Sequence, residues 1–421
     1  QKPGATAGDR EGRFMTGQHL LVISAGAARE YREYLLRSIT QDYRITLLDH
    51  RDQHWLSEYI DTRIPFDVST QDGIDAAIDV HSRDPFDGVL CYDETRVLQA
   101  ARLADVLGLR SGGAAGVEAC RDKHLTRLAL DAAGVRQPSS ALATDLVSAQ
   151  EAAEQIGYPV VLKPRALMAS EGVTVVHSNT DLRDAYQQTA ALTLETGPDL
   201  QFSSVLVEEY VEGPEFSVDG VVIDGVYEPL FVAEKKLGFS PYFEEVAHIV
   251  DGRSPLVTDA EFRQLMSRVH QALGLRTTMT HAEFRLTKRG ISIIEVNARL
   301  GGDLIPRVGW FATGIDAGSV AAAIAVGVAP SLNPTRAQAA MIRFCYPPGP
   351  MVVDHVIWAT SEGIVEAGAL VDTGDEVDLP PRQFVTGRVA YAIAEGPDPG
   401  KIERVLARFS DSVQVVGKQR F

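Results

Sequence analysis

Residues 293–303 read IIEVNARLGGD, an apolar strand pattern that carries Glu295 and Asn297 and then becomes a glycine-rich loop. Residues 281–286, HAEFRL, place Glu283 on a neighbouring strand, across a turn near residues 288–290. Because alternate strand residues face one side, Glu295 and Asn297 point together, and Glu283 can face them across the strand pair. Three oxygen ligands on one face suit Mg²⁺. We therefore predict a metal site here; a solvated polar face is the alternative.

A second cluster lies upstream, where Lys163 ends an apolar strand just before Pro164. The small-residue loop that follows contains Ser170, Glu171 and Gly172. A lysine held at a strand end can address a phosphate as a point charge, and a loop of small residues lets backbone N–H groups approach phosphate oxygens. We predict phosphate binding and a mobile lid here, with a surface Lys-Pro turn as the alternative. Lys123, at a helix start, is a weaker candidate for the same role.

The third cluster is the acidic segment VEEYVEGPE at residues 207–215. A strand that breaks at Gly213-Pro214 exposes backbone donors and acceptors, with which the edge of an adenine could pair. Glu215 could accept hydrogen bonds from ribose hydroxyls. Taken alone, the segment is an ordinary acidic strand end.

The periodicity of the chain predicts several lobes, as expected for 421 residues. Residues 15–112 alternate strands and helices, which indicates a parallel α/β domain, with Gly108 capping a helix. Its Ser24-Ala25-Gly26 turn lacks the GxGxxG pattern of dinucleotide sites and is interpreted as a tight strand-to-helix turn. Residues 1–14 are interpreted as a tag or flexible leader.

The remaining segments are predicted as two central lobes, residues 113–195 and 196–332, and a small C-terminal domain, residues 333–421. The second central lobe is expected to hold a mostly antiparallel sheet. Its predicted strands are residues 204–210, 215–223, 228–235, 278–286 and 291–296, and the C-terminal domain is expected to contain strands 339–346 and 387–394.

Composition excludes several classes of protein. A formal net charge of −17 disfavours broad nucleic-acid binding. Cys91, Cys120 and Cys345 form no CxxC pair, so neither a disulfide framework nor a cysteine zinc site is expected, and a cytoplasmic location fits. No apolar run has the length of a membrane span, and residues 318–330 are predicted to be a buried helix.

The order of these motifs resembles the ATP-grasp superfamily across residues 15–330. The resemblance rests on Asp122-Lys123, then Lys163-Pro164 with its loop, then VEEYVEGPEFSVDG, HAEFRL and IIEVNARLGGD. The segment PYFEEVAH at residues 241–248 and the C-terminal tail are similar to the L-amino acid ligases. The resemblance implies an α/β and α+β multidomain protein: an ATP-grasp fold with a Rossmann-like N-terminal domain and a small C-terminal α/β domain.

By this resemblance the chain is expected to join a small carboxylate and a small amine, through an acyl phosphate, with ATP and Mg²⁺ (or Mn²⁺) as cofactors. A homodimer is compatible with it. Another ATP-grasp branch, such as a carboxylase or purine-type ligase, and a non-catalytic ATP-binding regulator are the alternatives. The resemblance implies that the nucleotide phosphates contact Lys123 and Lys163, that the adenine is bordered by Glu208, Glu209 and Val211, and that the ribose binds Glu215. The metal would be held by Glu283, Glu295 and Asn297, and catalysis would use Arg299 with Lys163. The substrate pocket would be lined by Glu245, His248, Arg299, Gly302 and Asp303.

Three interpretations stay open at this stage. Asp303 either faces the substrate or caps the turn near Pro306. The pair Lys235-Lys236 either reaches substrate or phosphate or ends a strand in solvent. Ala247 stands where relatives often carry glycine, and the residue after Gly301-Gly302 varies among ligases, so selectivity for a particular side chain is not determined.

Overall fold

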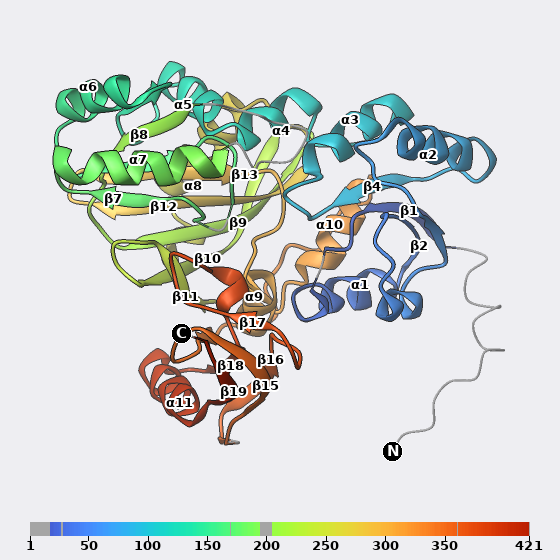
Figure 1. The fold of residues 1–421 in the computed structure, drawn as a ribbon. Helices are drawn as coiled ribbons and strands as arrows, with labels where there is room; N and C mark the ends of the chain where they lie inside the picture. The colour runs from blue at the N-terminus through green and yellow to red at the C-terminus, as the bar shows by residue number, and fades with distance from the viewer. Residues whose placement is uncertain (1–16, 27, 169, 194–203, 360, 421) are drawn as a thin grey trace.

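The computed structural model describes residues 17–26, 28–168, 170–193, 204–359 and 361–420. The predicted leader, residues 1–14, lies outside the described residues. Figure 1 shows three groups of helices and strands: the N-terminal unit, the central unit, and the C-terminal unit below them. The predicted lobe boundaries remain predictions, but the sheets show which strands share a layer.

The N-terminal unit is a parallel sheet in the order β3-β2-β1-β4, as the alternation of strands and helices predicts. Gly108 ends α3 in the left-handed conformation (φ 69°), so the predicted cap is confirmed. Strand β3 and helix α2 were not predicted. The elements are β1 Gln18–Ile23, α1 Glu33–Ile39, β2 Tyr43–Leu48, β3 Thr62–Ile64, α2 Gln71–Arg83, β4 Gly88–Cys91 and α3 Val97–Leu107.

A four-stranded sheet in the order β5-β8-β6-β7 follows. The expectation that strand 204–210 belongs to the larger sheet is wrong, because β8 pairs antiparallel with β5 and β6. An apolar strand pattern shows that a segment is buried in a sheet but carries no information about its partner. The elements are α4 Ala114–Arg121, α5 Lys123–Ala132, β5 Ser140–Ala143, α6 Leu146–Ile156, β6 Val160–Pro164, β7 Thr174–Val176, α7 Asn179–Thr193 and β8 Val205–Glu209.

The largest sheet has eight strands in the order β13-β12-β9-β10-β11-β14-β18-β16. Strand β11 was not predicted. Strands β14 and β18, expected in a separate C-terminal domain, extend this sheet through pairing of β11 with β14. The elements are β9 Glu215–Ile223, β10 Val226–Gly238, β11 Glu244–Asp251, α8 Ala260–Ala272, β12 Thr278–Thr287, β13 Gly290–Asn297, α9 Ile305–Thr313, α10 Ala317–Ala325, β14 Ala339–Cys345, β16 Ile364–Ala369 and β18 Ala390–Gly396.

The C-terminal unit also contains a small sheet, β17-β15-β19, and helix α11, which packs on β14 and β18. Their bounds are β15 Met351–Ile357, β17 Glu376–Val377, α11 Pro399–Ser412 and β19 Gln414–Gln419. Within the described ranges no single helix has the length and apolar character of a membrane span, although α9 and α10, bent by 105° at their break, meet that test of length and composition together.

Helix α10 joins the N-terminal and central units. Every residue of this Ala-rich helix except Ser319 is buried, which confirms the predicted buried helix as far as Ala325; residues 327–329 of the predicted range are exposed. It packs against α1, β4 and β12, and Figure 1 shows it between the N-terminal unit and the central strands and helices. The N-terminal sheet is therefore held close to the strands that carry the predicted metal ligands.

Candidate active site

Two cavities meet beside the edge of the large sheet. The first, of about 110 Å³, lies between β6, β8 and the loop before β7 on one side and β12 and β13 on the other. The second, of about 520 Å³, is bounded by the N-terminal unit, the loop after β13 and the C-terminal unit. Met168, Glu245, Glu283 and Arg299 line both cavities. The two spaces therefore share a junction at which Arg299 and Glu283 lie.

Most of the predicted site residues line these cavities. Gly172 and His248 line neither: Gly172 supports the loop with a positive φ of 72°, and His248 is buried behind Glu245. The residues at the first cavity are Lys123, Lys163, Ser170, Glu171, Glu208, Glu209, Val211, Glu215, Glu245, Glu283, Glu295, Asn297 and Arg299. Those at the second are Glu245, Glu283, Arg299, Gly302 and Asp303.

Lys163 is a buried residue of β6, so the surface-turn interpretation is wrong. Its Nζ lies 2.6 Å from Glu208 Oε2, and Arg127 donates to the same carboxylate at 2.7 Å. Burial lowers the pKa of Lys163, while the attraction of Glu208 opposes that change. Both oxygens of the Glu208 carboxylate are therefore engaged by Lys163 and Arg127. Glu208, in the cavity wall, holds the Lys163 side chain in position. Sequence reasoning missed Arg127.

The predicted metal ligands lie as strand pairing anticipates. Glu283 on β12 is directly opposite Glu295 on β13, and Asn297 follows Glu295 by one strand repeat. Lys123 Nζ lies 3.2 Å from Glu295 Oε1, and Lys235 Nζ lies 3.0 Å from Glu283 Oε1. The trio forms one oxygen-donor set on the cavity wall, which fits a hard cation such as Mg²⁺.

Lys235 is the centre of a carboxylate cluster that sequence reasoning left open. Its side chain is 1% exposed, and its Nζ lies 2.6 Å from Glu245, 3.0 Å from Glu283 and 3.3 Å from Glu215. The solvated interpretation is wrong for Lys235 and right for its neighbour Lys236, which is 43% exposed. Burial lowers the pKa of Lys235, but its three anionic neighbours outweigh burial and raise it well above the usual value.

Arg299 is held at the cavity junction by Glu94, which comes from the loop after β4. Arg299 donates from Nε to Glu94 and from Nη1 to the Leu300 carbonyl at 2.7 Å. Arg121 donates to the second oxygen of Glu94 at 2.6 Å. The sequence pattern did not reveal this partner of Arg299, because Glu94 is contributed by a different unit of the fold.

A buried histidine and aspartate support the loop that follows Arg299. His281 Nδ1 lies 2.6 Å from Asp219 Oδ1, and the Gly301 N–H donates to Asp219 Oδ2 at 3.1 Å. Burial lowers the pKa of His281, but Asp219 and Glu283 outweigh it and raise the pKa to about 9. His281 also lines the second cavity. Sequence reasoning quoted His281 in a motif without giving it a role.

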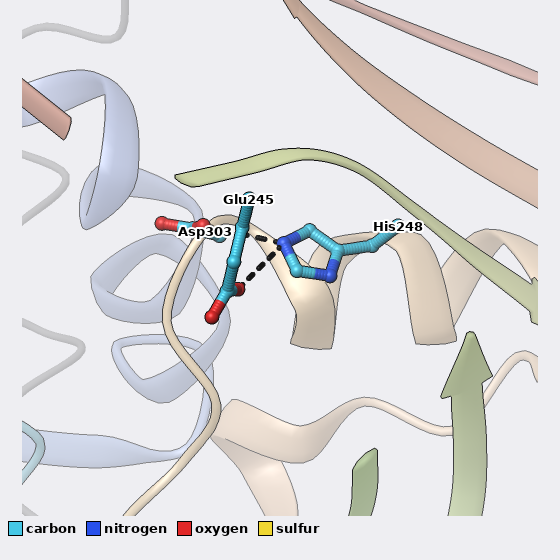
Figure 2. A group of neighbouring side chains, drawn as sticks. All are labelled: Glu245, His248 and Asp303. Carbon is cyan, nitrogen blue, oxygen red and sulfur yellow. Dashed lines mark hydrogen bonds and ion pairs between the residues drawn. The ribbon is translucent and has the colours of Figure 1, made fainter. Parts of the chain in front are cut away.

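Glu245, His248 and Asp303 converge on one another, as Figure 2 shows. His248 Nε2 lies 3.2 Å from both Glu245 Oε2 and Asp303 Oδ2, and the ligand atoms of all three residues lie within 4.8 Å. Burial lowers the pKa of His248, but the two carboxylates raise it above the ordinary value. The three side chains form a buried polar network in which His248 bridges the two carboxylates.

Arg388 on the C-terminal side completes this cluster. It donates to Asp303 Oδ1 and Oδ2 at 2.8 and 2.9 Å and to Glu244 at 3.0 Å, and it is fully buried. The turn-capping interpretation of Asp303 is wrong, because α9 begins without a side-chain cap and Asp303 instead binds Arg388. Arg388 lies 85 residues away in sequence, so no local pattern could pair the two.

The buried carboxylates predict how stability depends on pH. Burial raises the pKa of Glu94 and of Glu208, but the neighbouring cations outweigh it and lower both values from 4.5 to about 2. The unfolded state therefore binds protons first as pH falls, so stability present above pH 4.5 is lost between pH 4.5 and 2. Each group contributes on the order of 3 kcal/mol. Urea unfolding between pH 7 and 2.5 measures this loss.

Two glutamate variants separate the loss of stability caused by protonation of Glu94 from the loss caused by protonation of carboxylates in general. Glu94→Gln should make the stability less dependent on pH below 4.5, whereas Glu58→Gln, at an exposed position, should leave that dependence unchanged. An unaltered pH dependence in Glu94→Gln would contradict the assignment of the loss to Glu94.

The ATP-grasp domain family matches residues 156–307. Alanine–anticapsin ligase of Bacillus subtilis strain 168 is 28% identical over 252 residues, which cover 53% of this chain and 50% of that protein. Human carnosine synthase 1 is 26% identical over 77% of this chain and 42% of that protein. The chain spans about half the length of these relatives.

Solved structures show the same fold. The L-amino acid ligase from Bacillus licheniformis superimposes with a TM-score of 0.80 at 19% identity, over 96% of this chain and 99% of that one. The phosphoribosylglycinamide synthetase from Anaerococcus prevotii superimposes with a TM-score of 0.71 at 17% identity, over 96% and 100%. Residues 156–307 therefore carry an ATP-grasp domain, and the chain is similar in sequence to alanine–anticapsin ligase and in fold to an L-amino acid ligase.

Proposed function

We propose that this protein is an ATP-dependent ligase that joins a small carboxylate to a small amine, at least one of them an amino acid, and releases ADP and phosphate. The observation that carries the proposal is the shared junction: Arg299 and Glu283 line both cavities. A nucleotide in the first cavity and a carboxylate in the second would meet there. The similarity to alanine–anticapsin ligase and to carnosine synthase supports amino-acid substrates.

The first cavity suits ATP. Lys123 and Lys163 would neutralise its phosphates, assisted by the Ser170–Gly172 loop, while Glu209 and Val211 would border the adenine beside Glu208. Glu215 would accept the ribose hydroxyls. Glu283, Glu295 and Asn297 would hold Mg²⁺ or Mn²⁺, which neutralises phosphate charge when bound.

The chemistry needs positioned charge and no enzyme nucleophile. A carboxylate oxygen attacks the γ-phosphorus of ATP, the bond to the bridging oxygen breaks, and ADP leaves. The amine nitrogen then attacks the acyl carbon, phosphate departs, and the nitrogen loses a proton. Arg299 would stabilise the charge that develops on the acyl oxygen. Glu245, supported by His248 and Asp303, would bind a substrate ammonium group near Gly302.

The test measures ATP turnover with amino acids, singly and in pairs, together with mass spectrometry of the products. We expect ADP and phosphate, a condensed product that depends on both substrates, and a hydroxamate when hydroxylamine replaces the amine. Glu295→Gln serves as the inactive control. Release of AMP and pyrophosphate would contradict the acyl-phosphate route.

Two alternatives are separated by the same assay. Turnover supported by bicarbonate, but by no amino acid, would place the protein in the carboxylase branch. Tight ATP binding without turnover under any condition would favour a regulator. Small-molecule substrates, a cytoplasmic location and a homodimer remain predictions from the sequence.

A further inference from the structure

The second cavity contains an arginine without an anionic partner. Three arginines line this cavity: Arg32, Arg299 and Arg388. Arg299 is paired with Glu94, and Arg388 with Asp303 and Glu244. Across the described part of the chain, Arg32 has no side-chain hydrogen bond or ion pair, and its guanidinium lies over the ring of Tyr92. The free charge in this cavity therefore belongs to Arg32.

The position of Arg32 leaves its hydrogen-bond donors available. The residue lies between the short helix Arg29–Tyr31 and α1, and its Cζ is 5.3 Å from the centroid of the buried Tyr92 ring. Stacking occupies the face of the guanidinium and leaves the N–H groups at its edge free. A β-carbon at Gly26 would lie 2.9 Å from Arg32 Nε, so the turn at Gly26 borders the guanidinium closely.

The carboxylates near Arg32 already have partners. Asp93 accepts hydrogen bonds from Ser24 and Thr95 and is paired with Arg51. Glu94 is shared by Arg121 and Arg299. The negative charges of Asp93 and Glu94 stabilise the nearby cation of Arg32, although neither carboxylate forms an ion pair with it. The cavity therefore offers a planar cation to an anion that comes from outside the chain.

A buried hydroxyl nearby also has no partner. Tyr31, the neighbour of Arg32 in sequence, lines the same cavity, and its Oη is buried without a hydrogen bond. A buried hydroxyl left unpaired costs free energy, which a ligand can offset. The hydroxyl lies on the side of the cavity that Arg388 and Asp303 form, whereas the guanidinium of Arg32 supplies the fork of N–H donors that suits a carboxylate.

We propose that Arg32 binds the unreactive carboxylate of the amine substrate. The nucleophile is therefore an amino acid and not a simple amine. The inference rests on the proposed function. Ligation of two amino acids brings two carboxylates into the site, one activated and one retained in the product. Arg299, at the junction with the nucleotide cavity, serves the activated group, and Arg32, in the wall formed by the N-terminal unit, serves the retained one.

The experiment compares Arg32→Met with wild type, using an acceptor amino acid and its C-terminal amide. Loss of a charged hydrogen-bond partner should raise the KM for the acceptor amino acid between about 10-fold and 100-fold. The KM values for ATP and the activated substrate should change little, and the wild type should prefer the acid over the amide by a similar factor. Arg37→Met is the matched control, because Arg37 is 67% exposed and lines neither cavity.

Hydroxylamine distinguishes failure of this inference from failure of the proposed function. It has no carboxylate, so Arg32→Met should form hydroxamate at the wild-type rate. Absence of hydroxamate in wild type would overturn the ligase proposal itself. Equal use of acid and amide by wild type would overturn the role of Arg32, as would a raised KM for the activated substrate in the hydroxylamine reaction. If Arg32→Met does not fold, the wild-type preference for the acceptor acid over its amide still tests the role of Arg32. Arg32→Lys should give a KM for the acceptor amino acid between those of wild type and Arg32→Met.

Discussion

Replacing Arg299 with methionine should lower kcat by about 10²–10³ at saturating ATP, while nucleotide affinity changes by only a few-fold. Losing one donor aimed at the charge that develops in a transition state typically has an effect of this size. Arg299 lies where the two cavities join, and Glu94 and the Leu300 carbonyl hold it in place. Steady-state turnover and calorimetric titration with ADP measure the two quantities separately.

Arg121→Met provides a control matched in chemistry. Arg121 binds the same carboxylate of Glu94 but lines neither cavity. Its loss should weaken the support of Arg299 and lower kcat far less than loss of Arg299. Equal losses of kcat in the two variants would contradict a direct role for Arg299 in the reaction.

Replacing Arg388 with methionine should lower the free energy of unfolding by about 3–5 kcal/mol, because it leaves buried carboxylates without their cation. Arg388 is 1% exposed and binds Asp303 in a bidentate pair, together with Glu244. Without it, the charges of Asp303 and Glu245 would repel each other within the cluster of Figure 2. Urea unfolding at pH 7 measures the change in stability.

The exposed Arg382 offers the comparison for this second variant. Arg382 pairs with Asp378 on the surface, where its side chain is 70% exposed. Surface pairs contribute little, so Arg382→Met should cost less than about 1 kcal/mol. Similar losses in the two variants would show that the burial of Arg388 does not explain its effect. Adding Asp303→Asn to Arg388→Met should recover part of the lost stability, since one of the stranded charges is removed.

Local patterns predicted much of what lies on adjacent strands. Glu283, Glu295 and Asn297 were placed on one face from strand alternation and a short turn, and β12 and β13 pair in that way. Lys163 at the end of β6, Gly108 at the end of α3 and the buried helix α10 were likewise predicted from residues close together in sequence. In these cases a single element, or two elements joined by a tight turn, sets the geometry.

Contacts between distant segments were not predictable in this way. The pairing of β8 with β6, the three carboxylates around Lys235 and the binding of Asp303 by Arg388 all join residues far apart in the chain. A buried charge can be neutralised by any cation that the fold brings near, and the sequence does not rank those cations. Lys235 and Asp303 were therefore left with two interpretations each.

The sequence by itself determined the order of the motifs, the strand faces that carry the predicted metal ligands and the resemblance to the ATP-grasp superfamily, because each motif depends on residues within one or two consecutive elements. Only the tertiary structure decided which charges remain free. Whether Arg32, Arg299 or Arg388 can bind a substrate depends on which carboxylates lie within a few ångströms, and chain segments up to 205 residues apart in sequence set those distances.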